Sequence, residues 1–434
     1  MKKNVLDEPL ASPNYSARYQ RYVLFVLTGV YAFNFIDRQI LVILQEPIKA
    51  DLNLSDTQLG LLTGLAFAAL YVFLGLPIAR YADNHNRKNI VSISLVVWST
   101  MTALSGMAQN FIQILLARIG VGVGEAGGSP PAHSIISDYY EPKKRATALS
   151  IYSTGVYIGI FLGFLVGGII AEKYGWRTAL LALGIPGILY AGLVYFTVKE
   201  PIKGRLDESE GQEKNFKLGE VINTLLGKKT FVFLAVATGF QSFGNYGVGN
   251  WLPPFLERSH GMGLQSIGIT LGIIAAIGGG LGTFSGGWFT DKLRSRGVKW
   301  YCWVPALAAV FNFLPACFVF FGAPTNAVLG ALVITYFLSA LYLGPSIAVT
   351  HSLVPAKMRA FASAVLFFVL NVIGLGFGPL VIGVLSDWLE PTYGQDALRW
   401  AFTSTFVTGG IAAVLFYLAG KTYQSDLEKL NEGN

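Results

Sequence analysis

Four ionisable side chains lie within long apolar segments of the chain: Asp37, Arg38, Arg118 and Glu125. If these segments cross a bilayer, each charge costs about 2.5 to 3.5 kcal/mol near the centre. Left unpaired, the four together would cost about 10 to 14 kcal/mol, which is comparable to the stability of a whole domain. They must therefore pair with one another or face water. Charges in such places mark substrate pathways, proton relays or ligand sites.

The depths of these residues indicate which of them can meet. Asp37 lies about 10 Å before the expected end of its helix near Leu44, and Arg118 lies equally far from the expected start of its own helix near Phe111. We therefore expect an ion pair between Asp37 and Arg118. Glu125 follows Arg118 by almost two helical turns, so it shares the same face about 10 Å deeper.

These positions suggest a role for each charge. Asp37 is the expected proton-responsive switch, which holds Arg118 while ionised and releases it when protonated. Glu125 is the second candidate for proton coupling, or a counter-charge for Arg118, and the sequence does not rank the two acids. Arg118 and Arg38 are the candidate headgroup ligands, because guanidinium groups match phosphate and carboxylate in two-point contacts. The alternative is a static cluster that fixes two helices together, although buried ion pairs contribute little net stability.

The composition shows which elements carry these charges. Of 434 residues, 53% are hydrophobic and 13% are charged, against about 25% charged in soluble domains. Twelve membrane helices of about 20 residues would use roughly 240 positions, and the apolar fraction nearly meets that demand. This composition excludes a cytosolic enzyme. Cys302 and Cys317 share one apolar segment without metal-ligand spacing, so we expect no metal site. With four His residues and no clustered acid pair or Ser/His/Asp spacing, we also expect no catalytic residues.

Charge asymmetry predicts the topology. With the N-terminus in the cytoplasm, 25 of the 32 Lys and Arg residues fall on the cytoplasmic side and 5 on the other. This bias predicts that both termini are cytoplasmic. It also explains the net charge of +7 without nucleic acid as a partner. The predicted parts are an N-terminal arm (1–21), a six-helix bundle (22–198), a cytoplasmic connector (199–229), a second six-helix bundle (230–420) and a cytoplasmic tail (421–434).

The two halves resemble each other weakly, as in transporters built from duplicated bundles. Residues 142–148 precede a glycine series in the fifth expected helix, and 355–362 precede one in the eleventh. The loop at 79–88 and its partial copy at 287–292 resemble the loop motif of the major facilitator superfamily. This resemblance implies an all-α membrane fold of twelve helices in two pseudo-symmetric bundles. It also implies that Asp83, Arg87, Lys88 and Asp291 form a conformational latch between the halves.

More narrowly, segments 33–38, 117–126 and 127–133 resemble the spinster branch of that superfamily, in a bacterial member. The branch is associated with sphingosine phosphate and lysolipids. The resemblance implies a monomeric transporter in the bacterial inner membrane. It would move an anionic amphiphile by alternating access, with the proton gradient as energy source, no cofactor, and membrane lipid as its surroundings.

The second half offers only neutral groups for a cavity, because it contains no Asp, Glu, Lys or Arg deep in its helices. A charged wall facing a neutral, aromatic wall suits an amphiphile. A transporter of small organic anions is the alternative function, and an intramembrane lipid-modifying enzyme is a remote one. The expected cavity-lining residues are Phe35, Gln241, Asn245, Tyr336, Tyr342 and Asn371.

Overall fold

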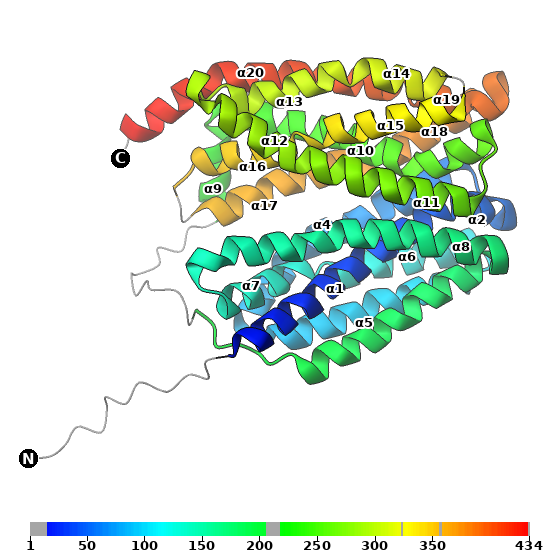
Figure 1. Cartoon of the computed structure of the whole chain (residues 1–434), viewed down its shortest axis with the longest axis horizontal. Helices are drawn as coiled ribbons and strands as arrows, with labels where there is room; N and C mark the ends of the chain where they lie inside the picture. Colours follow the sequence, from blue (N-terminus) through cyan, green and yellow to red (C-terminus); the bar gives the residue numbers. More distant parts are fainter. Residues whose placement is uncertain (1–14, 205–217, 323, 356–357, 433–434) are drawn as a thin grey trace, which may run out of the picture.

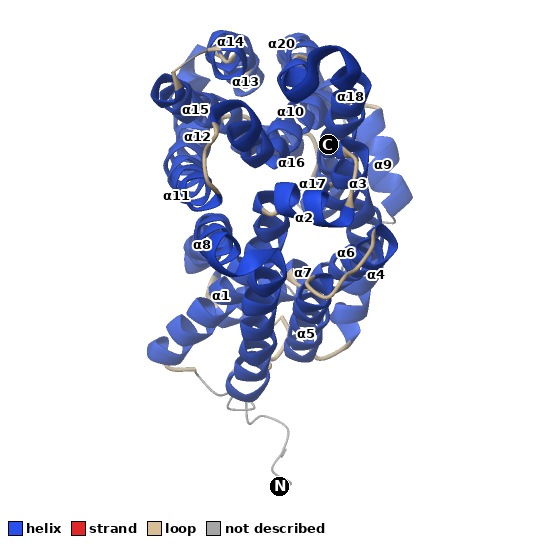
Figure 2. Ribbon diagram, turned by 90° about the vertical axis from the view of Figure 1, so that its right-hand side faces the viewer, coloured by secondary structure: helices blue, strands red, loops and turns tan. Residues whose placement is uncertain are grey.

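A computed structural model describes residues 15–204, 218–322, 324–355 and 358–432, and within them it is helical without strands. Figures 1 and 2 show the helices gathered in two groups, with the early helices in one and the late helices in the other. The first group contains α1 (Ala17–Ile43), α2 (Gln45–Leu52), α3 (Asp56–Thr63), α4 (Leu65–Asn84), α5 (Arg87–Ser105), α6 (Phe111–Glu125), α7 (Ser129–Tyr139) and α8 (Pro142–Thr197).

The second group begins after the connector and follows the same plan. Its elements are α9 (Leu218–Leu226), α10 (Lys229–His260), α11 (Leu264–Ile274), η1 (Ala275–Gly279), α12 (Gly280–Leu293), η2 (Arg294–Arg296), α13 (Trp300–Phe311), α14 (Phe313–Phe321), α15 (Thr325–Ala340), α16 (Leu343–Ser352), α17 (Arg359–Leu370), η4 (Asn371–Gly376), α18 (Phe377–Tyr393), η5 (Gly394–Asp396), α19 (Ala397–Ala401) and α20 (Ser404–Glu432). The segments η1 and η4 are π-helical turns.

The helices are long and apolar enough for an integral multi-pass membrane protein. Eight helical stretches of the described ranges meet this criterion, and the bent pair 219–226 with 229–260 is a ninth. Helix α8 holds two passages, because Gly175 breaks it with a φ of 83°, and the stretch 359–429 turns back at η5. With the 19-residue α5, the elements are consistent with the twelve predicted helices.

Both described ends of the chain lie on one side, at the left of Figure 1, which we call the terminus end. The opposite side, toward the viewer in Figure 2, is the far end. One buried apolar cluster unites Ile40 and Leu59 of the first group with Trp251 and Ile267 of the second. Two further clusters lie mainly in one group each, although the cluster of the first group also includes Leu375 of η4. The shared core therefore packs the two halves against each other.

Candidate substrate and proton site

Helices α1 and α6 bring the four internal charges together. Ser16 accepts a hydrogen bond from the Tyr19 amide at the start of α1, and Asn110 caps α6 in the same way. Glycines let α6 lie close to its neighbours: a Cβ at Gly122 would be 2.6 Å from the Phe67 carbonyl oxygen, and one at Gly124 would be 2.6 Å from the Trp98 amide. This close packing holds the charges away from water, and Asp37, Arg118 and Glu125 are at most 2% exposed.

Glu125 pairs with Arg38. Both Nε and Nη2 of Arg38 lie 2.7 Å from one carboxylate oxygen of Glu125, while the other oxygen has no hydrogen-bond partner. The guanidinium also lies 4.7 to 5.0 Å from the ring centres of Phe35, Phe67 and Tyr71. Since cation–π contacts of this kind stabilise a desolvated cation, Arg38 is fully engaged.

The predicted ion pair between Asp37 and Arg118 is wrong for this structure. Arg118 instead donates from Nη1 to the backbone carbonyl of Asp37 at 3.3 Å, and neither carboxylate oxygen of Asp37 has a hydrogen-bond partner in the described part. Glu125 forms its direct ion pair with Arg38 and still acts on Arg118 as a nearby opposite charge, so its predicted counter-charge role is not excluded. The position of a residue along a helix predicts its depth in the membrane, but not the direction in which its side chain points around the helix axis. Here that direction decides which partner the side chain meets.

Among the described residues, neither Asp37 nor Arg118 forms an ion pair, and both keep polar atoms without a hydrogen-bond partner. The Asp37 carboxylate faces the Thr102 hydroxyl without a hydrogen bond of ordinary geometry, and the Nε of Arg118 is also unpartnered. Buried polar groups are almost always satisfied in native structures, so exceptions point to function. Arg118 is a cation with free donors, and Asp37 is an acid free to take a proton.

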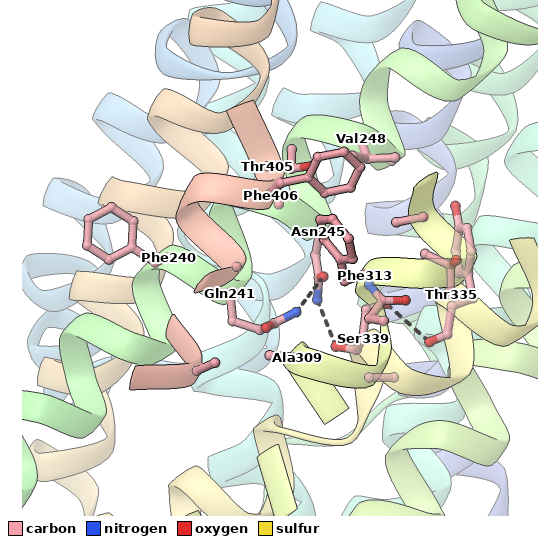
Figure 3. Close-up of a pocket in the computed structure, with 18 of the residues that line it drawn as sticks. Phe240, Gln241, Asn245, Val248, Ala309, Phe313, Thr335, Ser339, Thr405 and Phe406 are labelled. Atoms are coloured by element: carbon pink, nitrogen blue, oxygen red, sulfur yellow. Dashed lines mark hydrogen bonds between the residues drawn. The ribbon is translucent and has the colours of Figure 1, made fainter. Parts of the chain in front are cut away.

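A pocket of about 380 Å³ lies in the second half (Figure 3). Three of the six predicted cavity residues line it, namely Gln241, Asn245 and Tyr336. Gln241 donates to the Asn245 side chain at 3.3 Å, and Asn245 donates to the Ser339 carbonyl at 3.0 Å (Figure 3). The pocket wall is otherwise mostly apolar, and every residue that lines it belongs to the second half.

The other three predicted cavity residues lie elsewhere. Phe35 packs beside the Arg38 guanidinium, Tyr342 is buried in the core of the second half, and Asn371 begins η4. The four internal charges do not line this pocket either. Tyr246 of α10 packs against the apolar cores of both halves, so α10 connects the charged site with the pocket.

The predicted latch residues contact their own halves in this structure. Arg87 is buried and donates to Ser134, Asp138 and Glu200. Lys88 donates to Glu200 and the Tyr195 carbonyl, and Asp291 accepts from the Tyr301 hydroxyl. The Asp83 side chain is outside the described part of the structure. A latch between the halves therefore stays a prediction.

Sequence reasoning missed a polar network that joins the halves at the far end. Arg258 of α10 binds Glu46 of α2 at 2.6 Å and Asp56 of α3 at 2.7 Å. Asp387 of α18 accepts from the backbone amides of Asp56 and Thr57 at 2.9 and 2.7 Å. These residues looked like ordinary charges at helix ends, and the only available signal was that Asp56 directly precedes an apolar run.

The comparisons with known proteins agree with this architecture. The family model described as Major Facilitator Superfamily matches residues 27–372. The chain belongs to the major facilitator superfamily. This membership makes it a transporter rather than an enzyme. An efflux pump of the same superfamily from Mycolicibacterium smegmatis is 32% identical over 409 residues, which cover 93% of each chain.

Two further relatives lie in the spinster branch. The structure matches a bacterial homologue of the human lysosomal transporter Spinster, in an inward-facing and unoccupied conformation, with a TM-score of 0.88 and 32% identity. The match covers 95% of this chain and 99% of that one. The sphingosine-1-phosphate transporter SPNS2 of Danio rerio is 26% identical, covering 91% of this chain and 84% of the relative.

Proposed function

We propose that this superfamily member is a proton-coupled secondary transporter of anionic amphiphiles of the lysolipid or sphingosine phosphate type. The observation that carries the proposal is the pair of unsatisfied buried groups, the Asp37 carboxylate and the Arg118 guanidinium. The second half complements them with a neutral, largely apolar pocket. Such an arrangement suits a substrate with a charged head and an apolar tail.

The two groups suggest how transport and protons are coupled. Arg118 binds the anionic headgroup with the N–H groups of its guanidinium that do not donate to the Asp37 carbonyl. Asp37 lies beside that site, so its charge competes with the headgroup for the cation. Protonation of Asp37 removes the competitor and favours substrate binding, whereas deprotonation favours release. Glu125 already has a cationic partner in Arg38 and is the second candidate for the proton.

We place the protein in the bacterial inner membrane as a monomer, with the terminus end in the cytoplasm. The excess of Lys and Arg at that end supports this orientation. The network of Arg258, Glu46 and Asp56 then lies on the outer side, and we expect the substrate to leave or enter the buried site from the cytoplasmic side. The inward-facing state of the spinster relative supports the same assignment.

Reconstituted vesicles test the proposal directly. Labelled lysophospholipid and sphingosine phosphate are offered with and without a pH gradient, to the native chain, Arg118→Ala and Asp37→Asn. We expect a gradient to drive uptake by the native chain, Arg118→Ala to lose uptake of either lipid, and Asp37→Asn to transport at a rate that no longer depends on the gradient. If the uptake rate of Asp37→Asn depended on the pH gradient as that of the native chain does, the proposed coupling would be contradicted.

Small organic anions are the alternative substrates, since the cationic site alone would also accept them. Competition separates the two possibilities. An excess of a short dicarboxylate should leave lysolipid uptake unchanged if the apolar pocket contributes to affinity. Transport of the dicarboxylate without transport of either lipid would overturn the amphiphile assignment and leave the fold assignment intact.

A further inference from the structure

The pocket in the second half extends across that half. One edge is Gly279 of η1, whose carbonyl accepts a hydrogen bond from Tyr157 of the first half at 3.2 Å. The lining also includes Val310 and Phe313, which are 58% and 50% exposed. Both residues lie in apolar membrane helices, so the surface that they expose faces the hydrocarbon of the bilayer. The pocket therefore reaches from the interface between the halves to the lipid.

A local separation of two helices produces the lipid side of this pocket. Helix α13 packs closely along α20. After the helix break at Asn312, the α14 backbone lies farther from α20, and α14 reaches it with the rings of Phe313 and Phe320. Across the gap, α20 presents Gly409 and Gly410, and no atom lies within 4 Å of a Cβ built on either. The opening therefore lies between α14 and α20, at residues that carry no side chain to fill it.

Aromatic rings border the opening. The Phe313 and Phe406 rings, both at the pocket in Figure 3, are 4.9 Å apart. Phe320 stacks on Phe402 at 4.8 Å and closes the far-end side. Phe406 also lies 5.5 Å from Phe320, so the four rings form one continuous row beside the opening.

The walls indicate what the pocket holds. They contain no charged residue, and they are mostly aliphatic and aromatic. The amide oxygen of Asn312 and the hydroxyl of Thr335 are buried on the wall without a hydrogen-bond partner. An occupant that combines a hydrocarbon chain with one hydrogen-bond donor satisfies both kinds of surface.

We infer that the pocket is a side chamber that takes a single alkyl chain of an amphiphile directly from the bilayer, between α14 and α20. The chain slides in sideways past Phe313 and Phe406 and reaches Gly279 at the interface between the halves. Binding in the chamber does not require an anionic headgroup. Only the identification of that chain with the tail of a transported substrate rests on the proposed function.

Photolabelling tests the chamber without reference to transport. Vesicles containing the full chain receive a long-chain fatty alcohol that carries a diazirine, and after illumination the labelled residues are mapped by mass spectrometry. We expect labels on chamber walls such as Phe406 and Leu332. The substitutions Val310→Trp and Gly410→Leu should each reduce this labelling by about tenfold, the factor expected if two methylene groups of the chain lose their burial.

Leu314→Trp is the matched control, because Leu314 is 74% exposed on the neighbouring turn and does not line the pocket. It should label like the native chain. Equal labelling of the chamber in Val310→Trp, Gly410→Leu and Leu314→Trp would overturn the side opening, as would labels confined to lipid-facing residues outside the pocket. Because the probe is neutral, this outcome is independent of whether anionic lipids are transported.

Discussion

The Arg38 guanidinium is held on two sides, by the Glu125 carboxylate and by three aromatic rings. Removal of one partner of a buried ion pair costs about 3 to 5 kcal/mol, because the other charge stays buried without compensation. We therefore expect Glu125→Ala to lower the free energy of unfolding by about this amount. Thermal or denaturant unfolding in detergent micelles measures it.

A double-mutant cycle separates the ion pair from the loss of packing. In the variant Glu125→Ala with Arg38→Met, no charge is left uncompensated, so the combined loss should be smaller than the sum of the two single losses. Strict additivity of the two substitutions would show that the pair does not couple α1 to α6.

The sequence identified the four charges inside the apolar segments, because ionisable residues are rare there. It could not assign their partners. Arg38 follows Asp37 by one position, so the two side chains point about 100° apart on α1. Which of them meets α6 depends on how that helix is rotated, and this follows from the close packing at Gly122 and Gly124. That packing becomes visible only in three dimensions.

At the level of elements, the halves approach each other closely where α3 packs against α18. A Cβ at Gly383 would lie 2.3 Å from the Asp56 carbonyl oxygen. Overpacking of this kind costs about 1 to 3 kcal/mol, so Gly383→Val should lower the thermal midpoint of unfolding. Gly192→Val is the control, since no atom lies within 4 Å of a Cβ there. Equal losses in the two variants would contradict the proposed close approach.

A second contact between elements depends on pH. Arg177 of α8 forms an ion pair with Asp51 of α2, and this hydrogen bond lowers the pKa of the Asp51 carboxyl, with Trp176 as a further donor. Because the folded pKa is lowered, the stabilisation is complete above the ordinary value of about 3.9 and is lost as the pH falls through the folded pKa.

Asp51→Asn should therefore lower the thermal midpoint at pH 7, and its difference from the native chain should shrink below about pH 4. Unfolding curves recorded across this range provide the measurement. Arg177→Gln should lose the same pH-dependent part and, in addition, a pH-independent part from its hydrogen bond to the Ala108 carbonyl. A difference that stays constant with pH would exclude the ion pair as its source.

The elements themselves were largely predictable, because apolar runs and charge clusters define membrane helices. The breaks inside them were less so. Gly175 ends one passage of α8 with a positive φ, and η1 and η4 interrupt two helices of the second half with π-helical turns. No residue in η1 or η4 forces a π-helix locally. Both segments instead contact helices of the first half, so tertiary packing decides their geometry.

For the whole molecule, the far-end network is a set of charged contacts that joins the two halves. Arg258 neutralises Glu46 and Asp56 at once, and Lys49 adds a second cation to Asp56 at 2.6 Å. Helices α2 and α3, which carry Glu46 and Asp56, belong to the first half, and α10, which carries Arg258, belongs to the second. Opening of the far end must therefore break the Arg258 contacts. The free energy of these contacts thus contributes directly to the balance between the two open states.

Arg258→Gln should consequently shift this balance toward far-end opening. Hydrogen bonds to charged groups contribute about 1.5 to 3 kcal/mol, which corresponds to at least about a tenfold change in the ratio of states. Spin labels at the exposed positions Ala50 and Thr392 report the separation of the halves at this end. We expect a population of molecules with a longer distance between the labels, which the native chain shows only weakly.

Arg399→Gln is the control. It removes a cation that pairs within the second half, with Asp396 at 3.4 Å, so it should leave the distances between the labels unchanged. If both variants gave the native distances, closure would rest on the shared apolar core of Ile40, Leu59 and Trp251 rather than on charge.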